Sequence, residues 1–247
     1  MSASPIPVSE IKALTFDVFG TVVDWRGSVS REIASLAEER GLDVDADLFA
    51  DEWRAGYGPG MNKVRTGEWE WIGIDAIHRH RLDELLEQFG IEGLTEDEKA
   101  HLNKVWHRLD PWPEAVSGLT RLKSKFIISS LSNGSVALLT NMAKRAGIPW
   151  DCVLSSELSG HYKPDPQPYL KAAELLGLEP GEVMMTAAHQ NDLIAAGAQG
   201  LHTAFVRRPD EYGHGSGLGN TANPETDPSF DFTANGFNEL ADQLGCD

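Results

Sequence analysis

The spacing of apolar residues divides the chain into two kinds of segment. Residues 11–16 are mostly apolar and end at Asp17, and a glycine turn at Gly20 follows, so this stretch predicts a buried strand. From residue 25 to residue 110 apolar residues recur at helical spacing instead. The helices predicted there span residues 28–40, 46–55 and 69–89, with a break at 56–60 and a fourth helix after a capping box at Thr95-Glu96-Asp97-Glu98.

Strands and helices alternate beyond the segment Asp110-Pro111-Trp112-Pro113, which marks a boundary. The predicted strands are residues 126–131, 152–155, 183–187 and 202–206, and the predicted helices are residues 135–145, 167–176, 192–199 and 237–244. This alternation is typical of an α/β fold with a doubly wound, Rossmann-like parallel sheet. We therefore predict a core of residues 1–24 and 111–247, with residues 25–110 inserted as a helical cap.

A long segment without periodicity separates the last predicted strand from the last helix. It spans residues 207–228 and includes the Gly-rich stretch 213–219. It contains no GxGxxG pattern after a strand, so it does not indicate a dinucleotide site. Loops of this length serve as lids, partner surfaces or mobile segments, and we favour a flexible surface loop.

Charge narrows the range of partners. The 247 residues include 21 Lys and Arg against 38 Asp and Glu, which gives a net charge of −17. A surface this acidic argues against nucleic acids and anionic membranes as partners. A small anionic substrate would need cations placed locally within its site, so buried Arg and Lys residues become the candidates of interest.

The two cysteines, Cys152 and Cys246, have no metal-binding or redox spacing, and we interpret both as free thiols in a reducing compartment. The N-terminus lacks the basic-then-apolar pattern of a signal peptide, and no apolar run reaches the roughly 18 residues of a membrane helix. We expect a cytoplasmic protein.

Polar residues follow four predicted strands. The four clusters are Asp17 with Thr21, Ser132-Asn133-Gly134, Lys163-Pro164-Asp165, and His189 with Asp192. Each cluster alone is explained equally well as a turn, a helix cap or an exposed loop. In a doubly wound sheet, however, the carboxyl ends of the strands converge on one crevice, so their joint order predicts a site there.

These motifs, DxxGT, SNG, KPD and a late Asp, resemble those of the haloacid dehalogenase superfamily of hydrolases, and the resemblance covers nearly the whole chain. It implies a Rossmann-like core with a cap.

Two positions depart from the superfamily's phosphatases: Phe19 replaces an Asp that protonates the leaving alkoxide, and Ala188 replaces an Asp that binds Mg²⁺. A halide leaves without a proton, and a monovalent substrate needs no divalent metal. The resemblance therefore points to L-2-haloacid dehalogenases, which need no metal or other cofactor.

The resemblance also implies roles. Asp17 attacks the halogen-bearing carbon and forms an ester, which water then hydrolyses to release a 2-hydroxy acid. Lys163 and Asp192 hold the nucleophile and prepare the water. Ser132 binds the substrate carboxylate and Asn133 lies beside the halide. The remaining residues expected at the substrate or halide site are Thr21, Phe19, Tyr169 and the cap residue Arg54.

His189 departs from the commoner dehalogenase pattern, which has Asn there. It lies three residues before Asp192, and we expect it to bond Asp17 or to help the hydrolytic water, although a helix cap is the alternative. Expected substrates are haloacetates, fluoroacetate included, and 2-halopropionates, with halide as the released ion. The alternatives are a phosphatase or phosphonate hydrolase of the superfamily and a non-catalytic binding protein. The resemblance leaves room for a homodimer through apolar cap helices, because relatives often dimerise.

Overall fold

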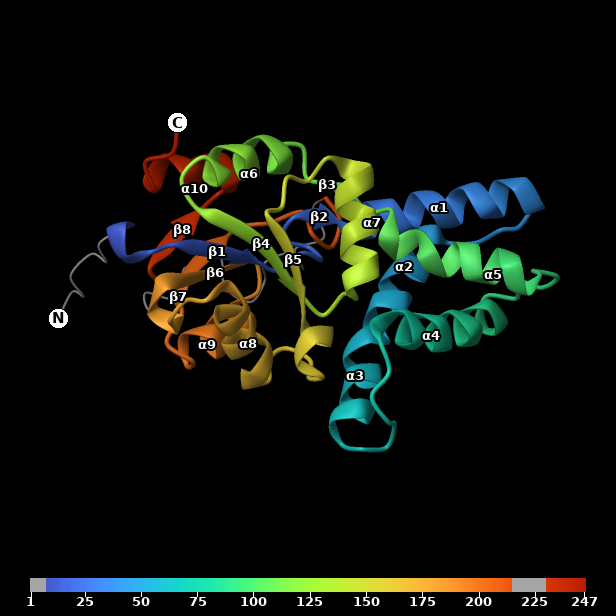
Figure 1. The fold of residues 1–247 in the computed structure, drawn as a ribbon. Helices are drawn as coiled ribbons and strands as arrows, with labels where there is room; N and C mark the ends of the chain where they lie inside the picture. The colour runs from blue at the N-terminus through green and yellow to red at the C-terminus, as the bar shows by residue number, and fades with distance from the viewer. Residues whose placement is uncertain (1–7, 215–229) are drawn as a thin grey trace.

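A computed structural model describes residues 8–214 and 230–247. Its centre is a six-stranded parallel sheet with the order β5-β4-β1-β6-β7-β8, which confirms the predicted fold class (Figure 1). The strands are β1 (Ala13–Phe16), β4 (Ile127–Ser132), β5 (Cys152–Ser155), β6 (Val183–Ala187), β7 (His202–Val206) and β8 (Phe232–Ala234). The edge strand β8 was not predicted, because its three residues are too few to show a period.

β1 lies in the middle of the sheet, and this position explains its composition. All four of its residues are buried, since β4 and β6 flank it and helices cover both faces. Phe16, its last residue, pairs with Ser130 of β4 and Thr186 of β6. The residue after Phe16 therefore emerges at the centre of the sheet's carboxyl edge, which is where ligands bind in open α/β sheets.

Helices of the core cover the two faces of the sheet. They are α6 (Ala115–Lys123), α7 (Val136–Ala146), α8 (Pro166–Leu176), α9 (Gln190–Gly197) and α10 (Phe237–Gln243). The helices α6 and α10 lie together on one face, and α8 and α9 lie on the other (Figure 1). The helix α6 was missed in the sequence, because its nine residues directly follow a segment interpreted as a boundary.

The inserted helical segment leaves and rejoins the core at neighbouring points, where β2 (Val23–Asp24) pairs antiparallel with β3 (Asp110–Pro111). Its helices are α1 (Trp25–Arg40), α2 (Ala46–Ala55), α3 (Tyr57–Arg65), α4 (Ile74–Gln88) and α5 (Glu96–Asn103). The capping box is present at the start of α5. The division into core and cap stays a prediction, although this pairing is what an insertion requires.

The predicted break at 56–60 was wrong, because most of it lies within α3. Pro59 falls in the first turn, where its missing N–H costs no helical hydrogen bond. Gly60 is needed for packing: a Cβ there would lie 2.3 Å from Ile77 Cγ2 of α4. The next predicted helix, 69–89, in fact begins only at Ile74. Ahead of it, the Ile72 carbonyl accepts a hydrogen bond from the Tyr162 hydroxyl of the core at 2.6 Å.

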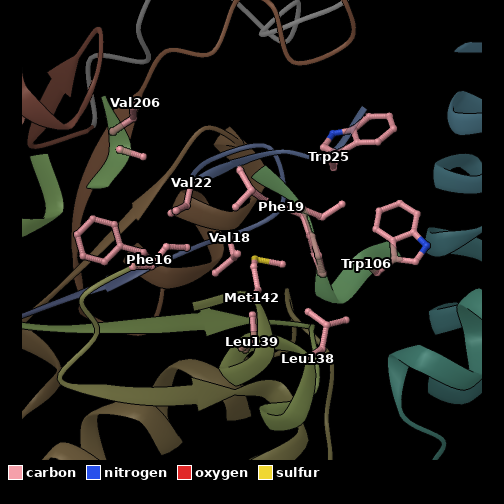
Figure 2. Close-up of a cluster of buried hydrophobic side chains, with 14 of the residues drawn as sticks. Phe16, Val18, Phe19, Val22, Trp25, Trp106, Leu138, Leu139, Met142 and Val206 are labelled. Carbon is pink, nitrogen blue, oxygen red and sulfur yellow. The ribbon is translucent and has the colours of Figure 1, made fainter. Parts of the chain in front are cut away.

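One apolar cluster runs from the sheet into the helical segment. Figure 2 shows its part around the end of β1. The residues labelled there are Phe16, Val18, Phe19, Val22, Trp25, Trp106, Leu138, Leu139, Met142 and Val206. Phe19 lies between the two parts, with its ring centroid 5.9 Å from that of Trp106. No helix within 8–214 or 230–247 has both the length and the apolar character that crossing a membrane demands.

Candidate active site

A cavity of about 330 Å³ opens at the carboxyl edge of the sheet, between the core and the helical segment. Its lining residues are Asp17, Phe19, Arg54, Tyr57, Met61, Asn133, Lys163, Pro164, His189, Asn191, Asp192 and Tyr212. Seven of the ten predicted site residues are in this set. The other three, Thr21, Ser132 and Tyr169, are fully buried.

The Lys163 ammonium bridges two buried carboxylates. Its Nζ lies 3.1 Å from Asp17 Oδ1 and 2.5 Å from Asp192 Oδ2. Burial alone raises the pKa of Asp17, but the Lys163 ammonium together with His189 and Thr21 holds that pKa well below its usual range. Asp17 is therefore ionised at neutral pH, as a carboxylate nucleophile must be.

Two hydroxyl groups outside the cavity fix these carboxylates. The Thr21 hydroxyl accepts the Ala188 N–H at 2.9 Å, which directs its own proton to Asp17 Oδ2 at 2.8 Å. The Tyr169 hydroxyl donates to Asp192 Oδ1 at 2.5 Å, and burial together with this neighbouring charge raises the pKa of Tyr169. Thr21 and Tyr169 thus support the site from behind.

His189 lies between two carboxylates, of which the sequence predicted only one. Its Nδ1 is 3.1 Å from Asp17 Oδ2, and its Nε2 is 2.9 and 3.1 Å from the two carboxylate oxygens of Glu211. Burial lowers the pKa of His189, but Glu211 and Asp17 raise it to about 10, so the ring is an imidazolium at neutral pH.

Glu211 and Tyr212 correct the interpretation of 207–228 as a surface loop. Glu211 is 1% exposed and Tyr212 lines the cavity, so the first part of this segment covers the site. Gly20 makes room for it, since a Cβ there would lie 2.1 Å from Glu211 Oε1. Residues 215–228 lie outside the described residues. In the sequence, Gly20 indicated a turn after Asp17, but no pattern identified Glu211 as the residue that packs against it.

The helical segment contributes the remaining cation. The Arg54 guanidinium lies over the Tyr57 ring at 4.2 Å and within 6.0 Å of the Phe19 ring centroid. Its Nη1 is buried and has no hydrogen-bond partner, and Arg54 forms no ion pair within the described ranges. Lys163 and His189, by contrast, are each held by two carboxylates. Among the described residues that line the cavity, Arg54 is therefore the cation left for an anionic ligand.

Asn133 holds the chain that carries Lys163. Its Oδ1 accepts the Lys163 N–H at 2.7 Å, and its Nδ2 donates to the Lys163 carbonyl at 3.2 Å and approaches Met61 Sδ at 3.3 Å. Met61 and Tyr57 come from α3 and were not predicted as site residues. The Ser132 hydroxyl accepts the Gly134 N–H at 3.2 Å, so its contact with a substrate stays a prediction.

The site bears on the choice between halide and phosphate chemistry. The position two residues after Asp17 is Phe19, which has no proton to give, and the position four residues before Asp192 is Ala188, which has no oxygen ligand. The two carboxylates that remain are already joined by the Lys163 ammonium. A phosphoryl group and its Mg²⁺ need oxygen ligands and an acid at these places.

Comparison with known proteins agrees with the geometry. A family model described as haloacid dehalogenase-like hydrolase matches residues 11–200. The (S)-2-haloacid dehalogenase 4A of Burkholderia cepacia is 31% identical over 83% of this chain and 88% of its own. A solved defluorinating L-2-haloacid dehalogenase is 44% identical, with a TM-score of 0.88 over 98% of this chain and 100% of that one. A phosphoglycolate phosphatase of Neisseria meningitidis serogroup A is 27% identical over 81% of each chain.

Proposed function

This chain belongs to the haloacid dehalogenase-like hydrolases, and on that premise we propose that it hydrolyses the carbon–halogen bond of short 2-haloalkanoic acids. One observation carries the proposal. An ionised, buried Asp17 shares a cavity of about 330 Å³ with Arg54, a cation that has no carboxylate partner in the described part of the chain. Such a cavity suits a small monoanion that carries its leaving group.

The first half-reaction is displacement of the halide. The Asp17 carboxylate attacks the carbon that bears the halogen, an ester bond forms, and the halide leaves with the bonding electron pair. Lys163 and Thr21 hold the carboxylate in place. Arg54 supplies the positive charge that the departing halide or the substrate carboxylate requires, and the rings of Phe19, Trp25 and Tyr57 surround its guanidinium.

The second half-reaction returns Asp17 to its free form. Water attacks the carbonyl carbon of the Asp17 ester, the bond between this carbon and the ester oxygen breaks, and a 2-hydroxy acid leaves with that oxygen as its hydroxyl. Asp192 and Lys163 position the groups around this carbon, and His189 lies at hydrogen-bond distance from the Asp17 carboxylate. No metal or other cofactor takes part in either half of the proposed reaction.

Phosphate ester hydrolysis is the second candidate, because phosphoglycolate phosphatases are among the relatives. Phe19 and Ala188 argue against it, since an alkoxide leaving group needs an acid and a phosphoryl group needs a metal. A non-catalytic binding role is less well supported. A binding protein has no need of a carboxylate held ionised by a buried ammonium.

Halide release tests the proposal. We expect release from fluoro-, chloro- or bromoacetate or from one enantiomer of 2-chloropropionate, at a rate that a chelator leaves unchanged and that Asp17→Asn abolishes. Mg²⁺-dependent release of phosphate from esters, with no halide from any haloacid, would establish the phosphatase instead. Identical ligand binding by the parent and by Asp17→Asn, with neither releasing halide, would favour a binding protein.

The remaining expectations concern assembly and location. We propose that copies of the chain pair through the helical segment, which is testable by light scattering across a concentration series. Cys152 and Cys246 are free thiols, and this supports our proposal that the enzyme works in the cytoplasm.

A further inference from the structure

Glu211 is built into the site although no part of the first half-reaction requires it. It is 1% exposed, accepts the Trp25 indole N–H at 3.2 Å, and occupies space that any residue larger than Gly20 would fill. Burying a carboxylate is costly unless a cation compensates for it. The cation that Glu211 contacts in the cavity is His189, at 2.9 Å. The question is therefore what this pair contributes.

In the free enzyme the pair cannot act as a base. Asp17 and Glu211 bond the two nitrogens of His189 from opposite sides, and two anions hold the ring in its doubly protonated form. An imidazolium has no lone pair to offer, so in this state His189 only donates to the nucleophile.

Esterification changes this balance. Once an oxygen of Asp17 is alkylated, the side chain is neutral, and His189 keeps a single carboxylate neighbour, Glu211. We infer that Glu211, acting through His189, prepares the water of the second half-reaction, and that esterification of Asp17 is the event that converts His189 into a base. The inference rests on the proposed function and deepens it. Glu211 is a positioning residue, because it acts only through the ring.

The two ring nitrogens of His189 take separate parts in the second half-reaction. After the halide leaves, Nδ1 of His189 loses its proton to solvent. Nε2 keeps its proton, which stays hydrogen-bonded to Glu211. This leaves the Nδ1 lone pair directed at Asp17. Water attacks the ester carbon and gives one proton to Nδ1. The tetrahedral intermediate then breaks its bond to the ester oxygen, which takes the proton from Nδ1 and leaves as the hydroxyl of the 2-hydroxy acid. The second water proton stays on the Asp17 carboxyl and then passes to Nδ1 of His189, which restores the carboxylate and the imidazolium of the free enzyme and leaves one proton released to solvent per turnover.

The other charges around the ring do not change during this cycle. Lys163 bonds the far oxygen of Asp17, and Asp192 bonds Lys163. The further titratable groups that face His189 or Glu211 across the cavity or from behind are Arg54, Tyr212 and Arg208. Among the neighbours of the ring that the structure describes, Asp17 is the one whose charge the reaction itself removes, so the switch follows from covalent chemistry at that residue.

The test separates the two half-reactions in Glu211→Gln. This variant keeps an amide oxygen for the His189 and Trp25 N–H groups but removes the negative charge. Rapid-quench measurements with bromoacetate should show a normal burst of about one bromide per site, followed by glycolate release slowed about 100-fold, within the range for loss of a general base. Mass spectrometry of the quenched protein should find a carboxymethyl group on Asp17.

Three comparisons make the result decisive. His189→Gln should trap the same ester, which keeps the test available if Glu211→Gln does not fold, and Glu211→Asp should restore part of the glycolate rate by restoring the charge. Glu157→Gln, at a glutamate that bonds the Val136 N–H instead, should behave as the parent. Equal slowing of bromide and glycolate without an ester would overturn the inference. A parent enzyme that releases no halide from any haloacid would refute the proposed function instead.

Discussion

Replacing Lys163 by Met tests whether the buried ammonium keeps Asp17 ionised. Lys163 is 6% exposed, and its Nζ lies 3.1 Å from Asp17 Oδ1. Coulomb's law at an effective dielectric constant of about 20 gives an attraction of about 5 kcal/mol for unit charges at this distance. Because about 1.4 kcal/mol corresponds to one pKa unit, losing the ammonium raises the pKa of Asp17 by roughly three units or more.

Two consequences follow for Lys163→Met. Asp17 and Asp192 then share a buried site with His189 as the nearest cation, so one of them takes up a proton near neutral pH. Halide release at pH 7 should fall by about 100-fold or more, and the remaining activity should rise with pH. The pH–rate profile of halide release, measured by stopped flow with chloroacetate, gives both quantities.

Stability gives an independent measurement with a defined sign. The folded-state pKa of Asp17 is depressed, so Asp17 stabilises the parent above the ordinary carboxyl range, and this contribution is lost as the pH falls through the folded-state pKa. Breaking the buried pair should cost about 3–5 kcal/mol at pH 7, and the difference from the parent should shrink in acid. Lys171→Met, at a half-exposed lysine of α8, is the control. A pH profile and a midpoint of urea unfolding that both match the parent would refute the electrostatic role of Lys163.

Three further predictions concern the groups around the same cavity. Arg54→Met should lower kcat/KM for haloacids by about 100-fold with little change in unfolding midpoint, since Arg54 has no carboxylate partner in the described ranges to lose; an unchanged kcat/KM would remove it from the site. The pKa of His189 is raised to about 10, so its stabilising contribution is complete below about pH 6.5 and is lost as the pH rises toward 10. The unfolding temperatures of the parent and of His189→Gln should therefore converge between pH 7 and pH 10. A constant difference between the two over this range would contradict the prediction. Gly20→Ala places a Cβ 2.1 Å from Glu211 Oε1 at a φ of +82° and should lower the free energy of unfolding in urea by about 1–3 kcal/mol. It should also slow glycolate release more than halide release. Equal slowing of the two rates would indicate that Gly20 serves the fold alone.

The sequence was most informative where local patterns and topology agree. The apolar run before Asp17 and the alternation of strands and helices after residue 111 required a parallel sheet, and such a sheet brings the ends of its strands together. Asp17, Lys163, His189 and Asp192 could be predicted as neighbours for this reason, although 146 residues separate Asp17 from Lys163. The structure brings all four to one cavity.

The residues that were missed lie in segments without a period. Tyr57 and Met61 belong to α3, whose glycines and Pro59 are typical of a turn in sequence. In the structure, Gly60 is needed because Ile77 of α4 packs closely against it. Glu211 lies in the described stretch 207–214, which contains no helix or strand, and only the folded chain brings it to His189. Contacts of this kind depend on the approach of distant segments and leave no local pattern.

By itself, the sequence determined the fold class, the order of the motifs and the place of Asp17 at the end of the first strand, because strand periodicity and the rule that parallel strands end at one edge are local and general properties. It also determined that Phe19 has no proton to give. Only the tertiary structure decided the charge state of the site. The ionised Asp17, the imidazolium of His189 and the Arg54 charge, which has no carboxylate partner among the described residues, follow from burial and from ångström-scale distances between segments far apart in the chain. Electrostatic energies in a protein interior depend on those quantities.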